Sequence, residues 1–362
     1  MAGMIYVAIV GCGVIGPVHA AALALDGDCE VRWAVDRDPA KWSRINARFH
    51  GLDVAEALAD PMVDLVCVCT PHPEHTAIVV AALAAGKHVL CEKPLASAPA
   101  DLARLEAAAA GRPDLVASGI FQHRFAPFAR RLRQVMADGD FGSVTGLDLQ
   151  FACTRDEAYY RSDAWRGTWA KEGGGVALNQ AIHTLDLGLW LAGMTPRSVT
   201  ARASRRLPFI EVEDRLEAVI ACDGGVNAGF SAVNDGVSGW FQRITVTCTR
   251  GGFTLGDGHR LLSLDHPSRA LVGELEAIDR IALDSRPLEG AKSVYGWHHA
   301  LQLADVLGAI RCGRRPFVGF AEALPANRTI LAAYHSVATG VAASLNLDTS
   351  TYRTPDLSQE HP

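Results

Sequence analysis

Residues 4–16 read MIYVAIVGCGVIG, a short apolar run of β-forming residues that passes directly into three glycines spaced as GxGxxG. The apolar run predicts a buried parallel strand, and the alanine-rich segment after it predicts a helix. A second strand is predicted over 30–35 and ends at Asp36, twenty residues after Gly16. This order of strand, glycine turn, helix, strand and acid is typical of a dinucleotide-binding unit.

Each part of the glycine turn has a physical role. Gly11 permits the tight turn, Gly13 lets a pyrophosphate approach the backbone, and Gly16 allows close packing of helix and strand. The N–H groups at the helix start would face the phosphates. The residues predicted to line the cofactor here are Gly11, Cys12, Gly13, Val14, Ile15 and Gly16.

Asp36 predicts which cofactor is used. A carboxylate at this position accepts hydrogen bonds from the adenosine ribose hydroxyls and repels a 2′-phosphate, so NAD is expected. The neighbouring Arg37 weakens this expectation, because its side chain is able to lie on the adenine or to bind a 2′-phosphate. NADP therefore stays possible.

Strand and helix patterns alternate up to about residue 123, which implies an α/β domain with a parallel, doubly wound sheet over 1–123. Strands over 63–69 and 87–91 are each followed by polar residues. Ligands of such sheets bind beyond the carboxyl ends of the strands. The residues placed there on the cofactor side are Thr70, His72, Glu92 and Lys93.

The pattern changes over 124–362, where strands follow one another with Gly224-Gly225 and Arg250-Gly251 as hairpin signals. This succession predicts an α+β domain with an open, mostly antiparallel sheet. The strands are predicted over 144–153, 198–207, 215–221, 226–232, 243–248 and 252–255.

One long helix is predicted within this succession, over the stretch GGGVALNQAIHTLDLGLWL at 173–191. Its apolar side chains recur at helical spacing and predict a core-facing stripe, and a polar stripe runs one position along. The three leading glycines would let another backbone or a ligand come close to the helix start. The apolar stripe is Leu178, Ile182, Leu185 and Leu189, and the polar one is Asn179, His183, Asp186 and Trp190.

Composition limits the possible partners. The 362 residues carry a formal net charge of -6, with no basic stripe for a nucleic-acid backbone and no apolar run of membrane-spanning length. The nine cysteines form no CxxC pair and no metal-ligand spacing, so no metal is expected. Free cysteines and an N-terminus without signal-peptide character predict a cytoplasmic protein.

Several segments together resemble one family. AIVGCGVIG, CTPHPEH, GKHVLCEKP, FQHRFAP and GGGVALNQAIHTLDLGLWLAG occur in the order and spacing of the glucose-fructose oxidoreductase / inositol dehydrogenase / MocA-like family. The resemblance covers nearly the whole chain. It implies a Rossmann domain, an α/β domain with an open sheet, and NAD(P)-dependent oxidation or reduction of sugars, cyclitols and related compounds.

The resemblance also assigns roles. Lys93 resembles the family's lysine beside the nicotinamide and the reacting carbon, and His183 resembles its general base. Trp165-Arg166 resembles a pair that reaches the cofactor in some members. Many members carry aspartate four residues before the histidine, where this chain has Asn179, so an acid role at that position is excluded. The strand-end positions that resemble cofactor-lining residues are Thr70, Pro71, His72, His75 and Glu92.

The expected chemistry needs a hydride acceptor, a base for the hydroxyl proton and a donor to the oxygen. NAD, His183 and Lys93 suit these roles, and Asn179 is able to hydrogen-bond a ring hydroxyl or the histidine. Candidate substrate contacts are Gln122, Arg124, Tyr159 and Tyr160.

Two alternatives to a dehydrogenase stay open. Some family members keep NAD bound and cleave a glycoside by transient oxidation and elimination, and a non-catalytic NAD-binding regulator is the other. In any of these, one face of an open antiparallel sheet lacks covering helices, which predicts a homodimer or homotetramer joined through that face.

Overall fold

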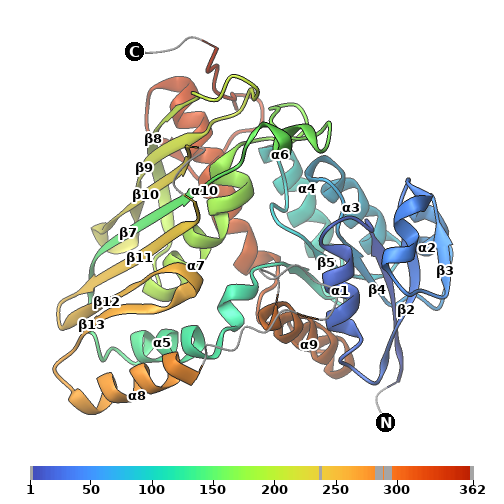
Figure 1. The fold of residues 1–362 in the computed structure, drawn as a ribbon, viewed down its shortest axis with the longest axis horizontal. Coiled ribbons are helices and arrows are strands. Elements are labelled where there is room, and N and C mark those ends of the chain that lie inside the picture. Colours follow the sequence, from blue (N-terminus) through green and yellow to red (C-terminus); the bar gives the residue numbers. More distant parts are fainter. Residues whose placement is uncertain (1–2, 236–238, 282–287, 289–295, 359–362) are drawn as a thin grey trace. The chain divides into compact units, whose positions relative to one another are not determined.

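The computed structural model describes residues 3–235, 239–281, 288 and 296–358 (Figure 1). The chain divides into two compact units, which we describe separately. The first comprises Met1–Ala96, Ala100–Phe125 and Asp284–Leu324, and the second Ser97–Pro99, Ala126–Leu283 and Pro325–Pro362. None of the helices in the described ranges is both long enough and apolar enough to cross a membrane.

The first unit contains a six-stranded sheet in the order β3-β2-β1-β4-β5-β6, and all of its pairings are parallel. This confirms the predicted doubly wound sheet. The central strands are buried on both faces, as their unbroken β-branched and apolar sequences require. The strands are β1 Ile5–Val10, β2 Cys29–Val35, β3 Phe49–Gly51, β4 Leu65–Val68, β5 His88–Cys91 and β6 Ala117–Gly119.

Helices from two distant parts of the sequence complete this unit. Helix α9 packs against α1, and Leu303 and Val306 join Val18 and Leu23 in one buried cluster. The predicted boundary after residue 123 stays a prediction, but 284–324 belongs to the first unit by its contacts. The α-helices are α1 Gly16–Leu23, α2 Val54–Ala59, α3 His75–Ala84, α4 Pro99–Ala110 and α9 Trp297–Cys312. The short 3₁₀ helices are η1 Pro39–Arg44, η2 His72–Glu74 and η3 Gln122–Phe125.

The second unit is built on an eight-stranded sheet in the order β13-β12-β11-β7-β10-β9-β8-β14. Its pairings are antiparallel except between β7 and β10, which confirms the predicted open, mostly antiparallel sheet. The strands are β7 Val144–Cys153, β8 Pro196–Ser204, β9 Arg215–Cys222, β10 Asn227–Asn234, β11 Phe241–Cys248, β12 Gly251–Leu255, β13 Leu261–Asp265 and β14 Ala343–Ser344.

Helices cover one face of this sheet, with α7 and α10 behind it in Figure 1. Helix α7 packs on β7 and β11, and Gly188 allows the close approach because a Cβ there would overlap the side chain of Leu149. The α-helices are α5 Pro127–Ala137, α6 Glu157–Arg161, α7 Ile182–Ala192, α8 Arg269–Ile281 and α10 Phe320–Thr339, of which α10 spans both units. The short turns are the π-helical η4 Ala177–Ala181 and the 3₁₀ helices η5 Asp223–Gly225 and η6 Asp257–His259.

Candidate active site

The glycine turn between β1 and α1 has the shape that a dinucleotide needs. Gly11 has a φ of +103°, and a Cβ there would overlap the carbonyl oxygen of Cys69. A Cβ on Gly16 would overlap the carbonyl oxygen of Gly11, so these two glycines serve the turn and the packing. By contrast, no described atom lies within 4 Å of a Cβ position on Gly13. This open approach to the backbone fits a pyrophosphate.

Asp36 at the end of β2 is anchored to this turn. Its carboxylate accepts hydrogen bonds from the backbone N–H of Cys12 at 2.8 Å and of Asp38 at 2.9 Å. The negative charge is therefore held beside the glycine turn, where the adenosine ribose is expected. Arg37 has an 81% exposed side chain and pairs with Glu74 at 2.8 Å. A surface ion pair of this kind contributes little and leaves the guanidinium able to move.

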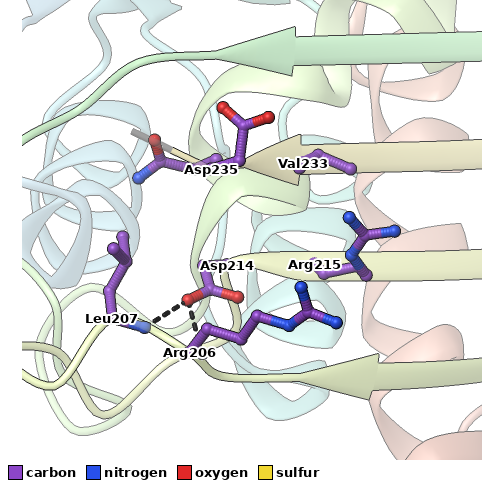
Figure 2. Close-up of a pocket in the computed structure, with 7 residues that line it drawn as sticks. Arg206, Leu207, Asp214, Arg215, Val233 and Asp235 are labelled. Atoms are coloured by element: carbon purple, nitrogen blue, oxygen red, sulfur yellow. Dashed lines mark hydrogen bonds between the residues drawn. The ribbon is translucent and has the colours of Figure 1, made fainter. Parts of the chain in front are cut away.

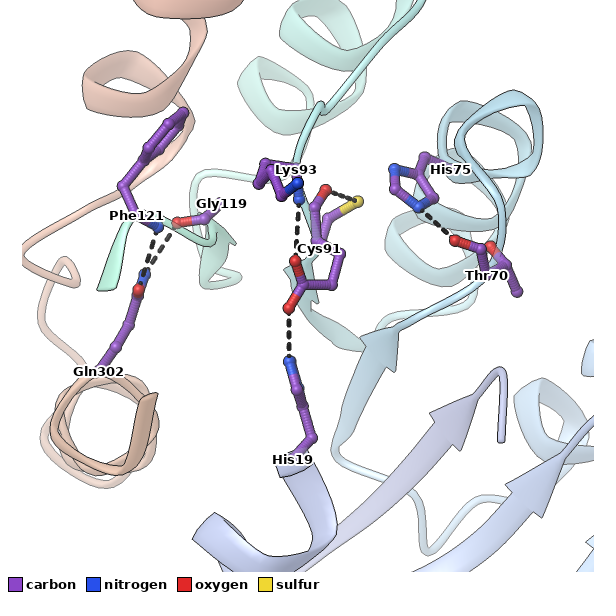
Figure 3. Close-up of polar contacts among 9 residues, drawn as sticks. His19, Thr70, His75, Cys91, Lys93, Gly119, Phe121 and Gln302 are labelled. Atoms are coloured by element: carbon purple, nitrogen blue, oxygen red, sulfur yellow. Dashed lines mark hydrogen bonds and ion pairs between the residues drawn. The ribbon is translucent and has the colours of Figure 1, made fainter. Parts of the chain in front are cut away.

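His75 ties together the loops that follow β4 and β5, and Figure 3 shows its contact with Thr70 in the first of these loops. Its ring is fully buried, with Nδ1 2.8 Å from the carbonyl oxygen of Pro94 and Nε2 2.9 Å from that of Thr70. Burial lowers the pKa of His75, and a neutral imidazole has one N–H, so it donates to one carbonyl at a time. Next to it, His72 is also buried, with its ring centroid 5.9 Å from that of His75. Pro71 and Thr70 are half-buried.

Glu92, at the end of β5, is a buried carboxylate whose main partner is His19 of α1. His19 Nε2 lies 2.9 Å from Glu92 Oε1 and is itself fully buried (Figure 3). Burial raises the pKa of Glu92, but the hydrogen bond and charge of His19, with the nearby His299 and Lys93, outweigh it and lower that pKa to about 2. Glu92 is therefore ionised at neutral pH, and its charge attracts the half-buried Lys93.

Gln302 of α9 fixes the loop that follows β6. Its Nε2 donates to the carbonyl oxygen of Gly119 at 2.8 Å, and its Oε1 accepts from the N–H of Phe121 at 3.1 Å. The two candidate substrate contacts that follow are buried: Gln122 lies 3.3 Å from the ring nitrogen of His123, and Arg124 donates to the carbonyl oxygen of Glu322 at 2.9 Å. One part of each side chain is therefore engaged within the protein.

In the second unit, the predicted helix over 173–191 begins later and less regularly than expected. Residues 177–181 form a π-helical turn, and α7 continues from Ile182. The predicted apolar stripe is confirmed as core, since all four of its residues are buried. The polar stripe divides, because Asn179 and Asp186 are buried whereas His183 and Trp190 are half-exposed.

Glu213 caps the start of this helix. Its fully buried carboxylate accepts hydrogen bonds from the N–H groups of Gly175 at 2.7 Å and Ala177 at 3.0 Å, and from the hydroxyl of Tyr334 at 2.8 Å. Burial raises the pKa of Glu213 to about 7. A Cβ on Gly174 would overlap the side chain of Tyr334. The absence of side chains on these glycines therefore lets other residues of the second unit pack closely against the start of the helix. The glycines predicted that another backbone approaches the helix start, and this backbone is that of Glu213.

Asn179 belongs to a buried polar cluster. Its Nδ2 donates to Oε1 of Glu172 at 2.5 Å and lies 3.3 Å from the hydroxyl of Tyr159. The Arg166 guanidinium donates to the same hydroxyl and lies 4.2 Å from the Tyr159 ring and 4.5 Å from the Trp165 ring. The structure thus brings together four residues that three separate predictions had named: Tyr159, the pair Trp165 and Arg166, and Asn179.

Two other features border or lie outside this cluster, and the first, Tyr160, packs on Tyr159 with ring centroids 5.2 Å apart. Tyr160 is buried with Ile210 and Val212, and its hydroxyl accepts from Asn234 at 3.2 Å. A pocket of about 110 Å³ opens near Asp214, whose carboxylate accepts from the N–H groups of Arg206 and Leu207 (Figure 2). Sites for small organic ligands measure roughly 300–1,000 Å³, so this pocket is too small for one.

Sequence reasoning missed His19, Glu172, Glu213 and Gln302. Glu172 had a signal, because it immediately precedes the three glycines, and His19 lies three residues after Gly16 in the helix of the glycine turn. Glu213 and Gln302 had none, since each acts on a segment distant in the sequence.

Comparisons with known proteins decide the family. Residues 5–120 match the model of the GFO/IDH/MocA oxidoreductase family with its NAD-binding Rossmann fold, and residues 129–254 match the model of the GFO/IDH/MocA C-terminal domain. The chain belongs to this family. It is therefore an oxidoreductase-family protein with an NAD-binding domain, and the predicted cofactor NAD is confirmed.

Relatives of this family member include the inositol 2-dehydrogenase of Rhizobium meliloti (strain 1021), 28% identical over 67% of this chain and 73% of the relative. The WlbA dehydrogenase of Bordetella pertussis, solved with NADH and UDP-GlcNAcA, is 25% identical with a TM-score of 0.87, and the alignment covers 96% of this chain and 99% of that one. The Chromobacterium violaceum WlbA structure with the same ligands is 27% identical, with a TM-score of 0.83 and coverage of 95% and 97%.

Proposed function

We propose that this protein is an NAD-dependent dehydrogenase that transfers a hydride between nicotinamide and a secondary alcohol of a sugar, glycoside or cyclitol. The Asn179 cluster is the main support. Asn179 is held by a buried hydrogen bond to Glu172 and by a part-buried one to the Tyr159 hydroxyl. An amide and a phenol fixed in this way suit the recognition of ring hydroxyls, because polar groups held in place give such sites their specificity. The family's NAD-binding domain supplies the other half of the argument.

Lys93 and His183 are the acid/base groups in this proposal. When bound, NAD supplies the hydride acceptor. His183 takes the hydroxyl proton, because imidazole is the side chain best suited to accept a proton near neutral pH. Lys93 donates a hydrogen bond to the same oxygen and steadies its developing charge. The ionised Glu92 attracts the ammonium group of Lys93 and restrains it at the end of β5.

The relatives guide the choice of substrates for a test. UDP-GlcNAcA is bound in two WlbA structures, and a curated relative is an inositol 2-dehydrogenase. A screen would therefore offer UDP-GlcNAcA, free sugars, glycosides and inositols with NAD, and would follow NADH absorbance. We expect NADH to accumulate with at least one member of this panel. A His183→Ala variant, which lacks the proposed base, serves as the inactive control.

The same screen distinguishes the alternatives. Cleavage of a glycoside without net formation of NADH would contradict the proposed dehydrogenase. It would indicate instead an enzyme that cleaves the glycoside by transient oxidation and elimination. Saturable NAD binding without turnover of any substrate or cleavage of any glycoside would favour a regulator instead. Product analysis by mass spectrometry separates the first outcome from a dehydrogenase, because only the dehydrogenase yields a ketone product in proportion to NADH.

A further inference from the structure

Glu172 holds Asn179 by a buried contact that the catalytic chemistry does not itself require. The side chain of Glu172 is 1% exposed, and its two carboxylate oxygens accept from different donors. Oε1 accepts from Asn179 Nδ2 at 2.5 Å, and Oε2 accepts from the N–H of Gly167 at 2.5 Å. Its own carbonyl oxygen accepts from the hydroxyl of Ser97 at 3.3 Å. The carboxylate is therefore fixed from both sides.

This contact determines which way the Asn179 amide is turned. Both carboxyl oxygens of Glu172 act as acceptors, so the NH₂ of the amide, and not its oxygen, faces Glu172. The same NH₂ lies 3.3 Å from the Tyr159 hydroxyl. With the nitrogen directed to Glu172, the amide oxygen is directed to the other side of the group. Asn179 thus presents an acceptor in a single orientation.

We propose that Glu172 is a positioning residue that fixes the Asn179 amide, so that a buried carboxylate lies one hydrogen bond away from position 179. The inference rests on the proposed function, because the orientation matters only if Asn179 meets a substrate hydroxyl or His183. The chain thereby keeps an acceptor at 179 while its charge stays at 172.

Glu172→Gln tests this directly. A glutamine cannot accept from both Asn179 and Gly167, because its NH₂ faces one of these two donors. Either the Asn179 amide turns over, or the contact with Gly167 is lost. We expect kcat to fall on the order of tenfold to a hundredfold, as misplacement of a group at a reacting centre does. The NAD dissociation constant should be unchanged, and Glu211→Gln, at an exposed carboxylate of the same unit, is the matched control.

A double-mutant cycle separates positioning from a general structural role. If Glu172 acts through Asn179, then Glu172→Gln should lower kcat little further in an Asn179→Ala background. Fully additive losses would overturn the proposal. The reciprocal exchange, Glu172→Gln with Asn179→Asp, should restore kcat relative to Glu172→Gln alone. In it, the glutamine oxygen accepts from Gly167 and its NH₂ donates to the new aspartate. No recovery in a folded exchange variant would also overturn the proposal.

A spectroscopic readout keeps the test independent of turnover. In ¹⁵N-asparagine-labelled protein, the side-chain amide signals of Asn179 are identified by their loss in Asn179→Ala. They should move upon Glu172→Gln and stay in place upon Glu211→Gln. Unmoved signals would refute the contact itself. If the wild type turns over no substrate but these signals move, the proposed function fails while the contact between Glu172 and Asn179 stands. If the wild type is active and Glu172→Gln is equally active, the proposed function stands and the positioning role of Glu172 fails.

Discussion

The carbonyl oxygen of Glu213 occupies the place that a Cβ atom on Gly175 would need. The carboxylate of the same residue accepts from the Gly175 N–H at 2.7 Å, so main chain and side chain of Glu213 together enclose the glycine. Only glycine permits this approach. The start of the helix that carries Asn179 and His183 is thereby fixed by a residue that lies just before β9. Its fixation is also sensitive to pH, because Glu213 is titratable.

The free energy of unfolding should depend on the proton of Glu213. Burial raises the pKa of Glu213 from 4.5 to about 7, so the unfolded chain loses this proton first as the pH rises. Below about pH 4.5 both states hold the proton and the group has no effect. Between about pH 4.5 and 7 the unfolded state binds fewer protons, so stability falls, by roughly 3 kcal/mol in total.

Glu213→Gln should remove this dependence. The variant loses one acceptor for the backbone N–H groups, so we expect it to be less stable than the wild type at pH 4.5. The difference in free energy of unfolding between the two proteins should shrink or reverse toward pH 7. Urea unfolding at a series of pH values measures it, with Glu211→Gln as the exposed control. Parallel stability profiles for Glu213→Gln and the wild type would mean that Glu213 does not titrate in this range.

Lys93→Met should impair turnover while leaving the cofactor bound. Loss of a group that donates to the reacting oxygen lowers kcat on the order of a hundredfold or more. The NAD dissociation constant, measured by fluorescence titration, should be nearly unchanged because the glycine turn and Asp36 are untouched. Lys41→Met, at a lysine paired with Asp38 on the surface, is the control. Near-normal turnover in Lys93→Met would remove this lysine from the mechanism.

The wild type should prefer NAD over NADP. The Asp36 carboxylate is held beside the glycine turn by the N–H groups of Cys12 and Asp38, where it would repel a 2′-phosphate. Asp36→Asn keeps the size of the side chain and removes its charge. The ratio of kcat/KM with NAD to kcat/KM with NADP should therefore be smaller in this variant than in the wild type. Arg37→Ala tests the contribution of the exposed guanidinium. A wild type that favours NADP would contradict the role assigned to Asp36.

Self-association through the uncovered face of the eight-stranded sheet is a further prediction. Small or half-exposed side chains of β7, β9 and β10 line this face, among them Ser231 and Val219, the latter 52% exposed. We expect a homodimer or homotetramer in light scattering at micromolar concentration. Val219→Arg should weaken it, whereas Val341→Arg, at a 62% exposed position outside the sheet, should not. A monomeric wild type would be inconsistent with this surface serving as an interface.

Local patterns predicted much of the fold. The alternation of Leu147, Leu149 and Phe151 marked β7 from its first to its last residue, because one face of that strand is buried. The glycine turn was equally readable, since its steric demands are local. The three-residue β3 was missed because so short a strand has no period of its own.

Long-range contacts explain the remaining differences. Helix α9 belongs to the first unit through its packing on α1, which nothing near either segment in the sequence indicates. The regular spacing of Asn179 and His183 suggested one continuous α-helix, whereas a π-helical turn precedes α7. Glu172 and Glu213 lie outside any periodic pattern, so their contacts with this turn emerge only once the chain is folded.

The last prediction concerns Asn179→Asp and the acid limb of kcat/KM in the direction of alcohol oxidation. An ionised aspartate one turn from His183 would stabilise the imidazolium and move the acid limb to higher pH. Glu172 changes this expectation. The new carboxylate would lie against the Glu172 carboxylate, where the present amide contact is 2.5 Å long. Two carboxylates so close share one proton, and the pair keeps a single negative charge across the neutral range.

The single variant should therefore show only a small displacement of the acid limb, because the charge of the pair equals that of Glu172 in the wild type. Glu172→Gln with Asn179→Asp moves this one charge next to the histidine, and its acid limb should lie at higher pH than in the wild type. Asn179→Ala should lower activity with little change in the limb. Profiles of kcat/KM against pH for the four proteins measure these differences. If the acid limb of the double variant does not move, then either position 179 does not influence the base or His183 is not the base. If the acid limb of Asn179→Asp alone moves as far as that of the double variant, then Glu172 and the new aspartate do not share a proton.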